Sequence, residues 1–527
     1  MTSTPKFPKR FVVIPQKTSV NLDEPQKITV VGLGQFTTRS PAARRSFQVA
    51  IAAPPGRGGG ATQVKILAAR PAALQPAPGL KVVKTSPTDC AVLVEGGNLS
   101  LTEVQEKSVP GAKVFQEQWY RLDRPARPWR KLSTELKKPR VKPGHGATYQ
   151  VKVVVDGPKP IPLADALVTV MLNSAKGIGL EVRTDTEGIA TFVLSKSTSE
   201  LESVAVEPLH SAWPVALLSV SVPQSTLTVK VPALAIDEPD ARNKVYGKAK
   251  IGDGKKVRVG VIDTGVGKHA ALTVLGGMNT TGESATLYTD EEGHGTHVAG
   301  VIASSASGWR RGEAPKVELL SYRIFKSGAE YASTFDISTA IKQAAADGCD
   351  LINLSIGGAE DGAVKDAIDL AWEAGCVCIA ATGNDGHDNV DYPAGYKRCL
   401  AVSAIGLEAS WPAGTYIDWT LSKVTGKQIA GSQTFFASFS NRGSKVAMTA
   451  PGVAIVSTIF GDRWGVMSGT SMASPIATGV VARGLAGSLA FDLPRDAARS
   501  QAIVDLALAN AEDLGFTASR QGKGLAR

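Results

Sequence analysis

Wholly apolar runs of strand length alternate with amphipathic runs of helix length through the C-terminal half of the chain. Strands that are apolar on both faces are typical of a parallel sheet that is covered by helices on each side. The sequence therefore predicts an α/β fold, a doubly wound parallel sheet, for residues 240–527. In such a sheet, ligands bind at the carboxyl ends of the strands. The runs lie at residues 257–262, 298–305, 317–324, 337–346, 351–356, 364–374 and 377–381.

The chain of 527 residues is long enough for about three domains. It contains no run of about eighteen apolar residues, which a membrane-spanning helix needs. The apolar stretch at 11–15 is shorter than the core of a signal peptide, which has about 7 to 15 residues. We therefore expect no membrane partner, and either a cytoplasmic location or export by a non-classical route.

The five cysteines are too few for a disulfide framework in a chain of this length. Cys376 and Cys378 have the spacing of half a metal site, but no second Cys/His pair lies nearby to complete it. They share one face of an apolar strand pattern. We therefore expect buried thiols, and no metal ligands.

The formal net charge of +10 comes from one part of the chain. Residues 1–150 have a net charge of +15, residues 151–240 of −5, and residues 241–527 of zero. The excess is densest at 121–142, where nine basic and two acidic residues stand among three prolines. We assign 123–147 as a basic, proline-containing linker. Nucleic-acid binding is an alternative use of this charge, but no known motif or aromatic platform accompanies it, and we expect no nucleic-acid partner.

Short runs of strand and helix character precede this linker. From residue 79 they follow the order strand, turn, strand, helix, strand, which is typical of a compact half-domain. The strand-like runs lie at 10–14, 27–32, 46–51, 90–94 and 112–122, and the helical run at 100–107.

Many short runs between residues 148 and 234 alternate apolar and polar residues and are separated by turn residues. This pattern is typical of a small antiparallel β-sandwich. The segment 164–194, with the turn sequence TDTEG between two strands, resembles the immunoglobulin-like modules found beside many bacterial enzymes. We predict a β-sandwich module at 148–234 that spaces, docks or binds and has no catalytic cluster of its own.

Three motifs carry the residues of an activated nucleophile. Asp263 ends the apolar strand of VGVIDTG, His294 opens the helical run of GHGTHVAG, and Ser471 opens that of SGTSMASP. A serine hydroxyl is a weak nucleophile unless an imidazole takes its proton, and a carboxylate fixes the tautomer of that imidazole. Each residue alone would more often be structural. Together, Asp263, His294 and Ser471 form a candidate catalytic triad.

These motifs resemble those of the subtilisin-like serine peptidases, in which the triad has the chain order Asp, His, Ser. The resemblance covers residues 240–527 and identifies them as a subtilisin-like peptidase domain. It implies a serine endopeptidase, a hydrolase of the subtilase family, which cleaves peptide bonds in protein or peptide substrates through an acyl-enzyme intermediate at Ser471.

The resemblance also implies roles for residues at other strand ends. Asn384 would supply the side-chain donor of the oxyanion hole, beside the backbone N–H of Ser471. Two wall segments would enclose the substrate backbone and the primary specificity pocket. They are Ser355, Ile356 and Gly357 on one side, and Ala381, Thr382 and Gly383 on the other.

Relatives that bind calcium tightly carry acidic residues after the Asp motif and in a loop after the His helix. The corresponding stretches in this chain, 268–272 and 304–311, offer few carboxylates for a hard cation. We expect no required cofactor. A structural calcium stays open as an alternative, although its usual ligands are absent from these stretches.

Subtilisin-like peptidases are commonly made as zymogens whose N-terminal propeptide blocks the cleft with its last strand. Residues 79–122 resemble the second half of such a propeptide, and we assign 1–122 as a propeptide-like inhibitory region. The resemblance implies that 118–122 lies in the cleft as a product-like strand and that the chain processes itself near Leu122 or in the linker. The alternative is a binding scaffold with an inactive peptidase fold, against which the intact triad weighs.

Overall fold

The computed structural model of the chain describes residues 9–14, 80–89, 91–108, 112–122, 136–142, 144–222, 226–247, 253–417, 425–428 and 432–527. The strand-like runs predicted at 27–32 and 46–51, and residues 123–135 of the predicted linker, lie outside the described residues. Residues 3–117 and 118–527 form two compact units.

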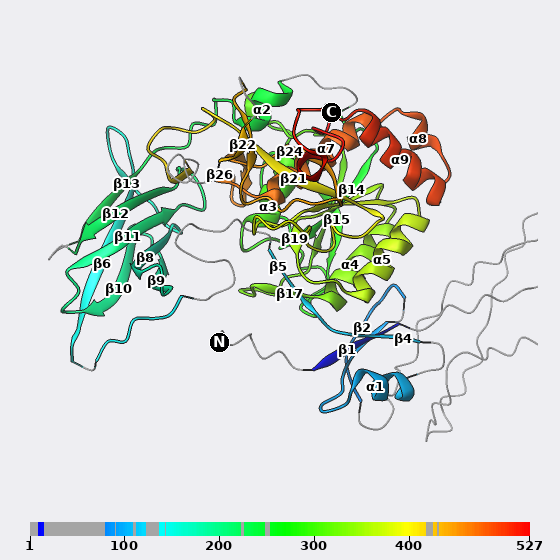
Figure 1. Ribbon diagram of the computed structural model, residues 1–527, viewed down its shortest axis with the longest axis horizontal. Coiled ribbons are helices and arrows are strands. Elements are labelled where there is room, and N and C mark those ends of the chain that lie inside the picture. Colours follow the sequence, from blue (N-terminus) through cyan, green and yellow to red (C-terminus); the bar gives the residue numbers. More distant parts are fainter. Residues whose placement is uncertain are drawn as a thin grey trace, which may run out of the picture. The chain divides into compact units, whose positions relative to one another are not determined.

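In the described residues of the N-terminal unit, an antiparallel sheet lies beside helix α1 (Leu101–Lys107), as Figure 1 shows. α1 begins at a capping box, in which the side chains of Ser100 and Glu103 each accept a hydrogen bond from the other's backbone N–H. Phe11 and Val104 belong to the same buried apolar cluster, so the helix packs on the sheet. The strands, in their order across the sheet, are β2 (Lys81–Thr85), β3 (Val92–Glu95), β1 (Arg10–Ile14) and β4 (Lys113–Gln116).

The single strand predicted at 112–122 is wrong, because this segment forms two strands that belong to different units. β4 pairs with β1, whereas β5 (Trp119–Leu122) pairs with β17 (Tyr331–Ser333) and β19 (Ile356–Gly357) of the larger unit. The alternation of apolar and polar residues shows that a segment is extended. It does not show which strand each half of the segment pairs with. The prediction therefore treated the two halves as one strand.

Residues 146–231 fold into two four-stranded sheets that share one apolar core, and we name this part the two-sheet module. Tyr149, Val168 and Phe192 contribute to that core from three different strands. β13 pairs with β6 in parallel, and the other described pairs in the module are antiparallel. One sheet contains β6 (Gly146–Val155), β7 (Ile161–Pro162), β10 (Ile189–Ser195) and β13 (Leu227–Val231). The other contains β8 (Leu167–Asn173), β9 (Ile178–Arg183), β11 (Glu200–Glu207) and β12 (Val215–Ser221).

Nine strands form the central sheet of the larger unit, in the order β15-β16-β14-β18-β20-β21-β23-β22, with β24 also paired to β21. Seven of them pair in parallel, and β23 pairs antiparallel with β21 and β22. The strands are β14 (Arg258–Asp263), β15 (Val274–Asn279), β16 (Glu318–Arg323), β18 (Leu351–Leu354), β20 (Val377–Ala381), β21 (Cys399–Leu407), β22 (Thr425–Gln428), β23 (Thr434–Ala437) and β24 (Val446–Pro451).

The central sheet is therefore mixed and mostly parallel, and the prediction of an all-parallel sheet is wrong at one edge. There β21 continues beyond its pairing with β24, and β22 and β23 fold back beside it as antiparallel strands. Antiparallel neighbours need only a short connection, whereas parallel neighbours need a crossover.

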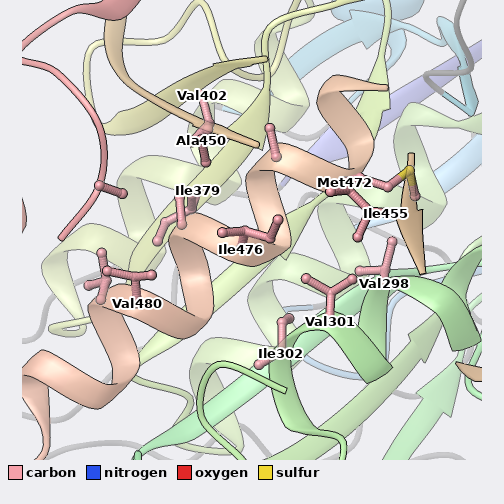
Figure 2. Close-up of a cluster of buried hydrophobic side chains, with 14 of the residues drawn as sticks. Val298, Val301, Ile302, Ile379, Val402, Ala450, Ile455, Met472, Ile476 and Val480 are labelled. Atoms are coloured by element: carbon pink, nitrogen blue, oxygen red, sulfur yellow. The ribbon is translucent and has the colours of Figure 1, made fainter. Parts of the chain in front are cut away.

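Helices cover both faces of the central sheet. On one face, Val298 of α3 and Ile476 of α7 meet Ile379 of β20 in a single buried cluster, as Figure 2 shows. On the other face, α4 and α5 pack over Ile352 and Cys378. Neighbouring residues of one strand thus belong to opposite cores, which explains the wholly apolar runs. The helices are α3 (His294–Ala303), α4 (Thr334–Ala346), α5 (Gly362–Glu373), α7 (Thr470–Leu485) and α9 (Ala497–Ala509).

The smaller elements include a hairpin that the two-sheet module contacts. Strands β25 (Ile455–Ile459) and β26 (Arg463–Met467) form this hairpin, and the carbonyl oxygen of Trp464 accepts from Ser211 N–H at 2.8 Å. Among the described residues, no helix combines the length and the apolar character that a membrane crossing requires. The other helices whose bounds lie in the described ranges are α2 (Ala241–Tyr246), a 3₁₀ turn (Gly308–Arg310), α8 (Leu489–Asp492) and α10 (Ala518–Gln521).

Candidate active site

Asp263 and His294 are hydrogen-bonded at the carboxyl end of β14. Asp263 is the last residue of that strand, and His294 is the first residue of α3. His294 Nδ1 lies 2.8 Å from Asp263 Oδ1, and both side chains are buried. A carboxylate in this place holds the imidazole proton on Nδ1, so that Nε2 is the basic nitrogen.

The start of α3 packs directly against the turn that follows Asp263. A Cβ on Gly295 would lie 2.1 Å from the carbonyl oxygen of Gly265, so no larger residue fits at this position. Gly295 N–H also donates a hydrogen bond to Thr264 Oγ1 at 2.9 Å. The glycine of the GHGTH motif therefore allows the close approach that brings His294 to Asp263.

Asp290 connects the two motifs. Its carboxylate accepts hydrogen bonds from Thr264 Oγ1 at 2.9 Å and from Thr296 Oγ1 at 2.5 Å. It also accepts from the backbone N–H groups of Glu292, Gly293 and Thr296. Burial raises the pKa of Asp290, and the hydrogen bonds act in the opposite direction. The predicted site does not include Asp290, whose only sequence signal is an acidic residue in the turn before α3.

Ser471 is the second residue of α7 and is buried. Its hydroxyl donates to the carbonyl oxygen of Ser355 at 3.3 Å, and Ser355 Oγ donates to the carbonyl oxygen of Ser471 at 2.9 Å. Among the described residues, His294 Nε2 has no hydrogen-bond partner, so this structure does not join Ser471 to His294 by a hydrogen bond. Such catalytic hydrogen bonds often tighten only in the reacting complex.

Asn384 lies beside the first turn of α7. Its Oδ1 accepts hydrogen bonds from the Thr470 backbone N–H at 2.8 Å and from Thr470 Oγ1 at 3.0 Å. These contacts fix the orientation of the amide, with the oxygen toward Thr470 and Nδ2 as the donor end. Thr470 is thus a second residue that the predicted site does not include, although it stands in the SGTSMASP motif.

The two predicted wall segments reach the first turn of α7. Ser355 does so through its two hydrogen bonds with Ser471, and Ile356 and Gly357 follow it as β19. On the other side Ala381 ends β20, Thr382 is buried directly after it, and the Gly383 N–H donates to Thr470 Oγ1 at 3.3 Å. The structure thus brings Ser471, Asn384 and both wall segments together.

β5 lies between β17 and β19 as the central strand of a small antiparallel sheet (Figure 1). Leu122 pairs with Ile356, and Arg121 pairs with both Gly357 and Tyr331. One residue before the strand, Gln118 exchanges two hydrogen bonds of 3.0 Å with Thr334. The segment predicted to be product-like therefore adds a strand to the first wall segment.

Tyr120 anchors β5. Its side chain is fully buried, and its hydroxyl donates to the carbonyl oxygen of Ala359 at 2.6 Å. The ring lies over Gly358, where a Cβ would be 2.7 Å from the ring carbon Cγ. The absence of a side chain at residue 358 therefore makes the space that Tyr120 fills.

Two carboxylates that the sequence motifs do not indicate lie beside the second wall segment. Asp385 Oδ2 forms an ion pair with Arg121 Nη2 of β5 at 2.8 Å. The Asp391 N–H donates to the carbonyl oxygen of Thr382 at 2.9 Å. Asn441 joins the two acidic residues, because it accepts from Asp385 N–H at 3.0 Å and donates to Asp391 Oδ1 at 3.2 Å.

Side-chain cations occupy the stretch after α3 that was compared with calcium sites. Arg310 Nε donates to the carbonyl oxygen of Ile236 at 2.8 Å, and its Nη2 donates to that of Glu238. Arg311 forms an ion pair with Asp253 at 2.6 Å. Oxygen ligands of the kind that Ca²⁺ prefers are thus already bound by guanidinium groups, and these residues do not fit a calcium site. No cluster of three His, Cys, Asp or Glu side chains suited to a metal occurs within the described ranges.

Comparison with known proteins places this geometry in a family. The sequence model of the subtilase family matches residues 254–523. Subtilisin DY from Bacillus licheniformis is 36% identical over 239 residues, which are 44% of this chain and 76% of that protein. Subtilisin E from Bacillus subtilis strain 168 is 33% identical over 269 residues, 50% of this chain and 60% of that protein. Alkaline elastase YaB from Bacillus sp. strain YaB is 30% identical over 303 residues, 54% of this chain and 73% of that protein. The chain is a serine endopeptidase of the subtilase family.

Proposed function

We propose that the chain hydrolyses peptide bonds in proteins through an acyl-enzyme intermediate at Ser471 and that it processes its own N-terminal region. The hydrogen bond of 2.8 Å between His294 and Asp263 is the observation that carries the catalytic part of the proposal. This bond orients the buried imidazole and leaves Nε2 of His294 as its basic nitrogen. A serine nucleophile needs such a base to take its hydroxyl proton.

In the proposed mechanism, Ser471 Oγ attacks the carbonyl carbon of the scissile bond while His294 Nε2 takes the hydroxyl proton. The tetrahedral intermediate collapses when His294 returns that proton to the leaving amine, and the acyl group stays on Ser471. A water molecule then attacks the ester, His294 takes the water proton, and Ser471 recovers it as the carboxylic acid leaves. Asp263 stabilises the imidazolium that forms in both steps.

The oxyanion of each tetrahedral intermediate would accept hydrogen bonds from Asn384 Nδ2 and from the Ser471 N–H. Thr470 supports this assignment because its two hydrogen bonds hold the oxygen end of the Asn384 amide. The Ser471 N–H belongs to the first turn of α7, where backbone N–H groups point out of the helix and favour an anion. Removal of one such donor costs about 3 to 4 kcal/mol of transition-state stabilisation in relatives of this kind.

The N-terminal region would act as the intramolecular inhibitor, with β5 in the place of a bound product. The pairing of Leu122 with Ile356 and of Arg121 with Gly357 supports this, because a strand in that register covers the first wall segment. We further propose that residues 1–122 are a propeptide-like region and that the two-sheet module is an immunoglobulin-like sandwich, with no calcium needed for activity.

The test compares the full-length wild-type chain with Ser471→Ala. Each is exposed to a fluorophosphonate probe, which reacts with activated serines, and the N-termini of all fragments are sequenced. We expect the wild type to bind the probe at Ser471 and to yield a fragment that begins after Leu122. The Ser471→Ala chain should stay intact and unlabelled.

Ser488→Ala is the matched control, because it removes a hydroxyl just beyond the far end of α7, where Ser488 Oγ bonds only the nearby Leu485 carbonyl oxygen. It should react with the probe as the wild type does. Identical fragments from the wild type and Ser471→Ala, or a folded wild type that never reacts with the probe, would contradict the proposal.

A further inference from the structure

Two carboxylates beside the second wall segment are not used by the chemistry proposed for Ser471. Asp385 directly follows Asn384, and Asp391 contacts the second wall segment through Thr382. The Asp385 side chain is only 15% exposed, and within the described part of the chain its Oδ1 has no hydrogen-bond partner. A buried carboxylate oxygen without a donor is unfavourable, and in this part of the chain Oδ1 lacks one even though Oδ2 pairs with Arg121, so the site can accept a further donor.

The two carboxylates also act on each other. Burial and the nearby charge of Asp385 raise the pKa of Asp391 to about 6, whereas Arg121 and His387 act to lower it. Among the described residues, Arg121 is the only lysine or arginine in an ion pair with Asp385. Arg121 thus supplies the ion-pair partner of Asp385, and His387 lies near Asp391.

Arg121 is not part of the cleft itself. It belongs to β5, which covers the first wall segment and has to leave before a substrate strand can take its place. After β5 leaves, Asp385 and Asp391 stay beside the second wall segment, while Asp385 has lost its ion-pair partner. Breaking a buried ion pair by removal of one partner is strongly unfavourable, because the remaining charge is uncompensated. A substrate that brings a cation to the same position removes this penalty.

We propose that the cleft selects peptides with an arginine opposite Gly357, on the N-terminal side of the scissile bond, whose guanidinium group binds Asp385 and Asp391. The proposal rests on the endopeptidase function proposed above. Arginine is favoured over lysine because its planar guanidinium group has five donors and can bond two carboxylates at once, whereas an ammonium group is a point charge. The substrate class is therefore arginine-containing segments in extended conformation.

The experiment uses the full-length chain and a pair of internally quenched peptides. Both contain the sequence Gln-Trp-Tyr-X-Leu followed by neutral residues, with X either arginine or citrulline, which has nearly the same shape without the charge. We expect the wild-type kcat/KM to be at least about tenfold higher for the arginine peptide, since Asp385 is mostly buried whereas a third of Arg121 stays exposed. Mass spectrometry of the products shows that both peptides are cut at the same bond.

Asp385→Asn and Asp391→Asn should each reduce this ratio, and Asp385→Asn should bring it close to one. Asp388→Asn is the matched control on the same loop, because Asp388 is 79% exposed and pairs with Arg442 instead. It should keep the wild-type ratio. A wild-type ratio near one, or a ratio that both substitutions leave unchanged, would overturn the proposal.

The fluorophosphonate probe, applied to the same samples, separates the two hypotheses. A chain that reacts with the probe and cleaves both peptides equally well is an endopeptidase without the arginine preference. A folded chain that neither reacts nor cleaves refutes the endopeptidase function and the inference with it.

Discussion

At the scale of single residues, the site depends on side chains that hold two motifs together. Asp290 accepts five hydrogen bonds, from residues on both sides of the contact between the Asp263 turn and the start of α3. Four of the five donors belong to the buried residues Thr264, Gly293 and Thr296, so no water replaces the carboxylate for them. Asp290 therefore stabilises the chain and positions His294 relative to Asp263.

Asp290→Asn should lower the free energy of unfolding by about 2 to 4 kcal/mol. The NH₂ group of asparagine would replace one accepting oxygen, and the N–H and O–H groups that bond that oxygen would lose their acceptor. The substitution should also slow the reaction of Ser471 with the fluorophosphonate probe. Urea unfolding at pH 7 measures the first effect. Glu291→Gln is the matched control, since Glu291 is half exposed and its ion pair with Arg323 is worth less than about 1 kcal/mol. Equal losses for the two variants would contradict the role of Asp290.

The residues that could be predicted from the sequence stand in a motif, although Thr470, which stands in the SGTSMASP motif, was not among them. Asp263, His294 and Ser471 each end a strand or begin a helix within a recognisable motif, and a strand end and a helix start have signals in the local sequence. Thr470, Asp385 and Asp391 gain their roles only from neighbours that are far away in the chain. Their contacts depend on the fold, and no local pattern contains that information.

At the scale of elements, Tyr120 helps to hold β5 in place through both its ring and its hydroxyl. The ring stabilises the bound strand because its apolar surface is removed from water. The hydroxyl adds one hydrogen bond to the carbonyl oxygen of Ala359. Burial raises the pKa of Tyr120 far above its ordinary value, so the hydroxyl stays a donor. The two contributions can be separated by substitution.

Tyr120→Ala should weaken the binding of β5 between β17 and β19 by about 3 to 5 kcal/mol. Tyr120→Phe should weaken it by about 1 kcal/mol. The initial rate at which Ser471 of the full-length chain reacts with the fluorophosphonate probe should rise in the same order, because the cleft opens more often. Trp119→Ala, a change at the half-buried neighbour, should raise it less. A rate for Tyr120→Ala that equals the wild-type rate would show that β5 does not cover the site.

The 3₁₀ turn after α3 permits a prediction about calcium. A calcium ion at a hundred times its dissociation constant would stabilise the folded chain by about 2.7 kcal/mol. Because Arg310 already binds the carbonyl oxygens there, we expect the melting temperature to be the same, within about 1 °C, in excess calcium and in excess chelator. Arg310→Ala should lower it under both conditions. A rise of several degrees in calcium would reveal a site that these residues do not form.

The segment 112–122 shows that the sequence of a strand does not specify its pairing partner. Both of its halves are strands, and both bury part of their side chains. The change of partner falls between Glu117 and Gln118, at the boundary of the two compact units. Pairing partners depend on the whole fold, whereas extended conformation depends on local sequence, and only the second was predicted.

At the scale of the whole molecule, His210 lies where the two-sheet module contacts the β25–β26 hairpin. Its Nε2 is 2.6 Å from Arg463 Nη1 and accepts from it, since the guanidinium group can only donate. Burial, and then the positive charge of Arg463, lower the pKa of His210 from 6.5 to about 4. Burial also lowers the pKa of His297 to about 3.

The unfolded chain therefore takes up a proton on His210 near pH 6.5, while the folded chain does so only near pH 4. Between these values the unfolded state holds more protons, so the free energy of unfolding should fall as the pH decreases from 6.5 to 4, by about 1 to 2 kcal/mol for His210. His210→Gln should lose less stability over this range than the wild type, and the exposed His145→Gln should behave as the wild type does. Melting temperatures at pH 7 and pH 4.5 measure this, and equal losses in all three chains would contradict it.

The architecture of the larger unit could be predicted because its strands are apolar on both faces. Ile379 and Cys378 lie in opposite cores, and a short run of such residues is typical of a strand that helices cover on both sides. The antiparallel edge was not predicted, since β22 has no apolar run and that of β23 is only three residues long. The N-terminal sheet places β1 between β3 and β4, which lie far from it in sequence, and such distant pairing cannot be read from local patterns.

The position of β5 has a consequence for how such a chain would be controlled. While the chain is whole, β5 and the sites it pairs with belong to one molecule, and their encounter does not depend on how much protein is present. A cut beyond Leu122 turns the same contact into an association of two molecules, which follows mass action. A concentrated preparation would then stay inhibited after the cut, because β5 would still be bound. Dilution would dissociate β5 and restore peptidase activity.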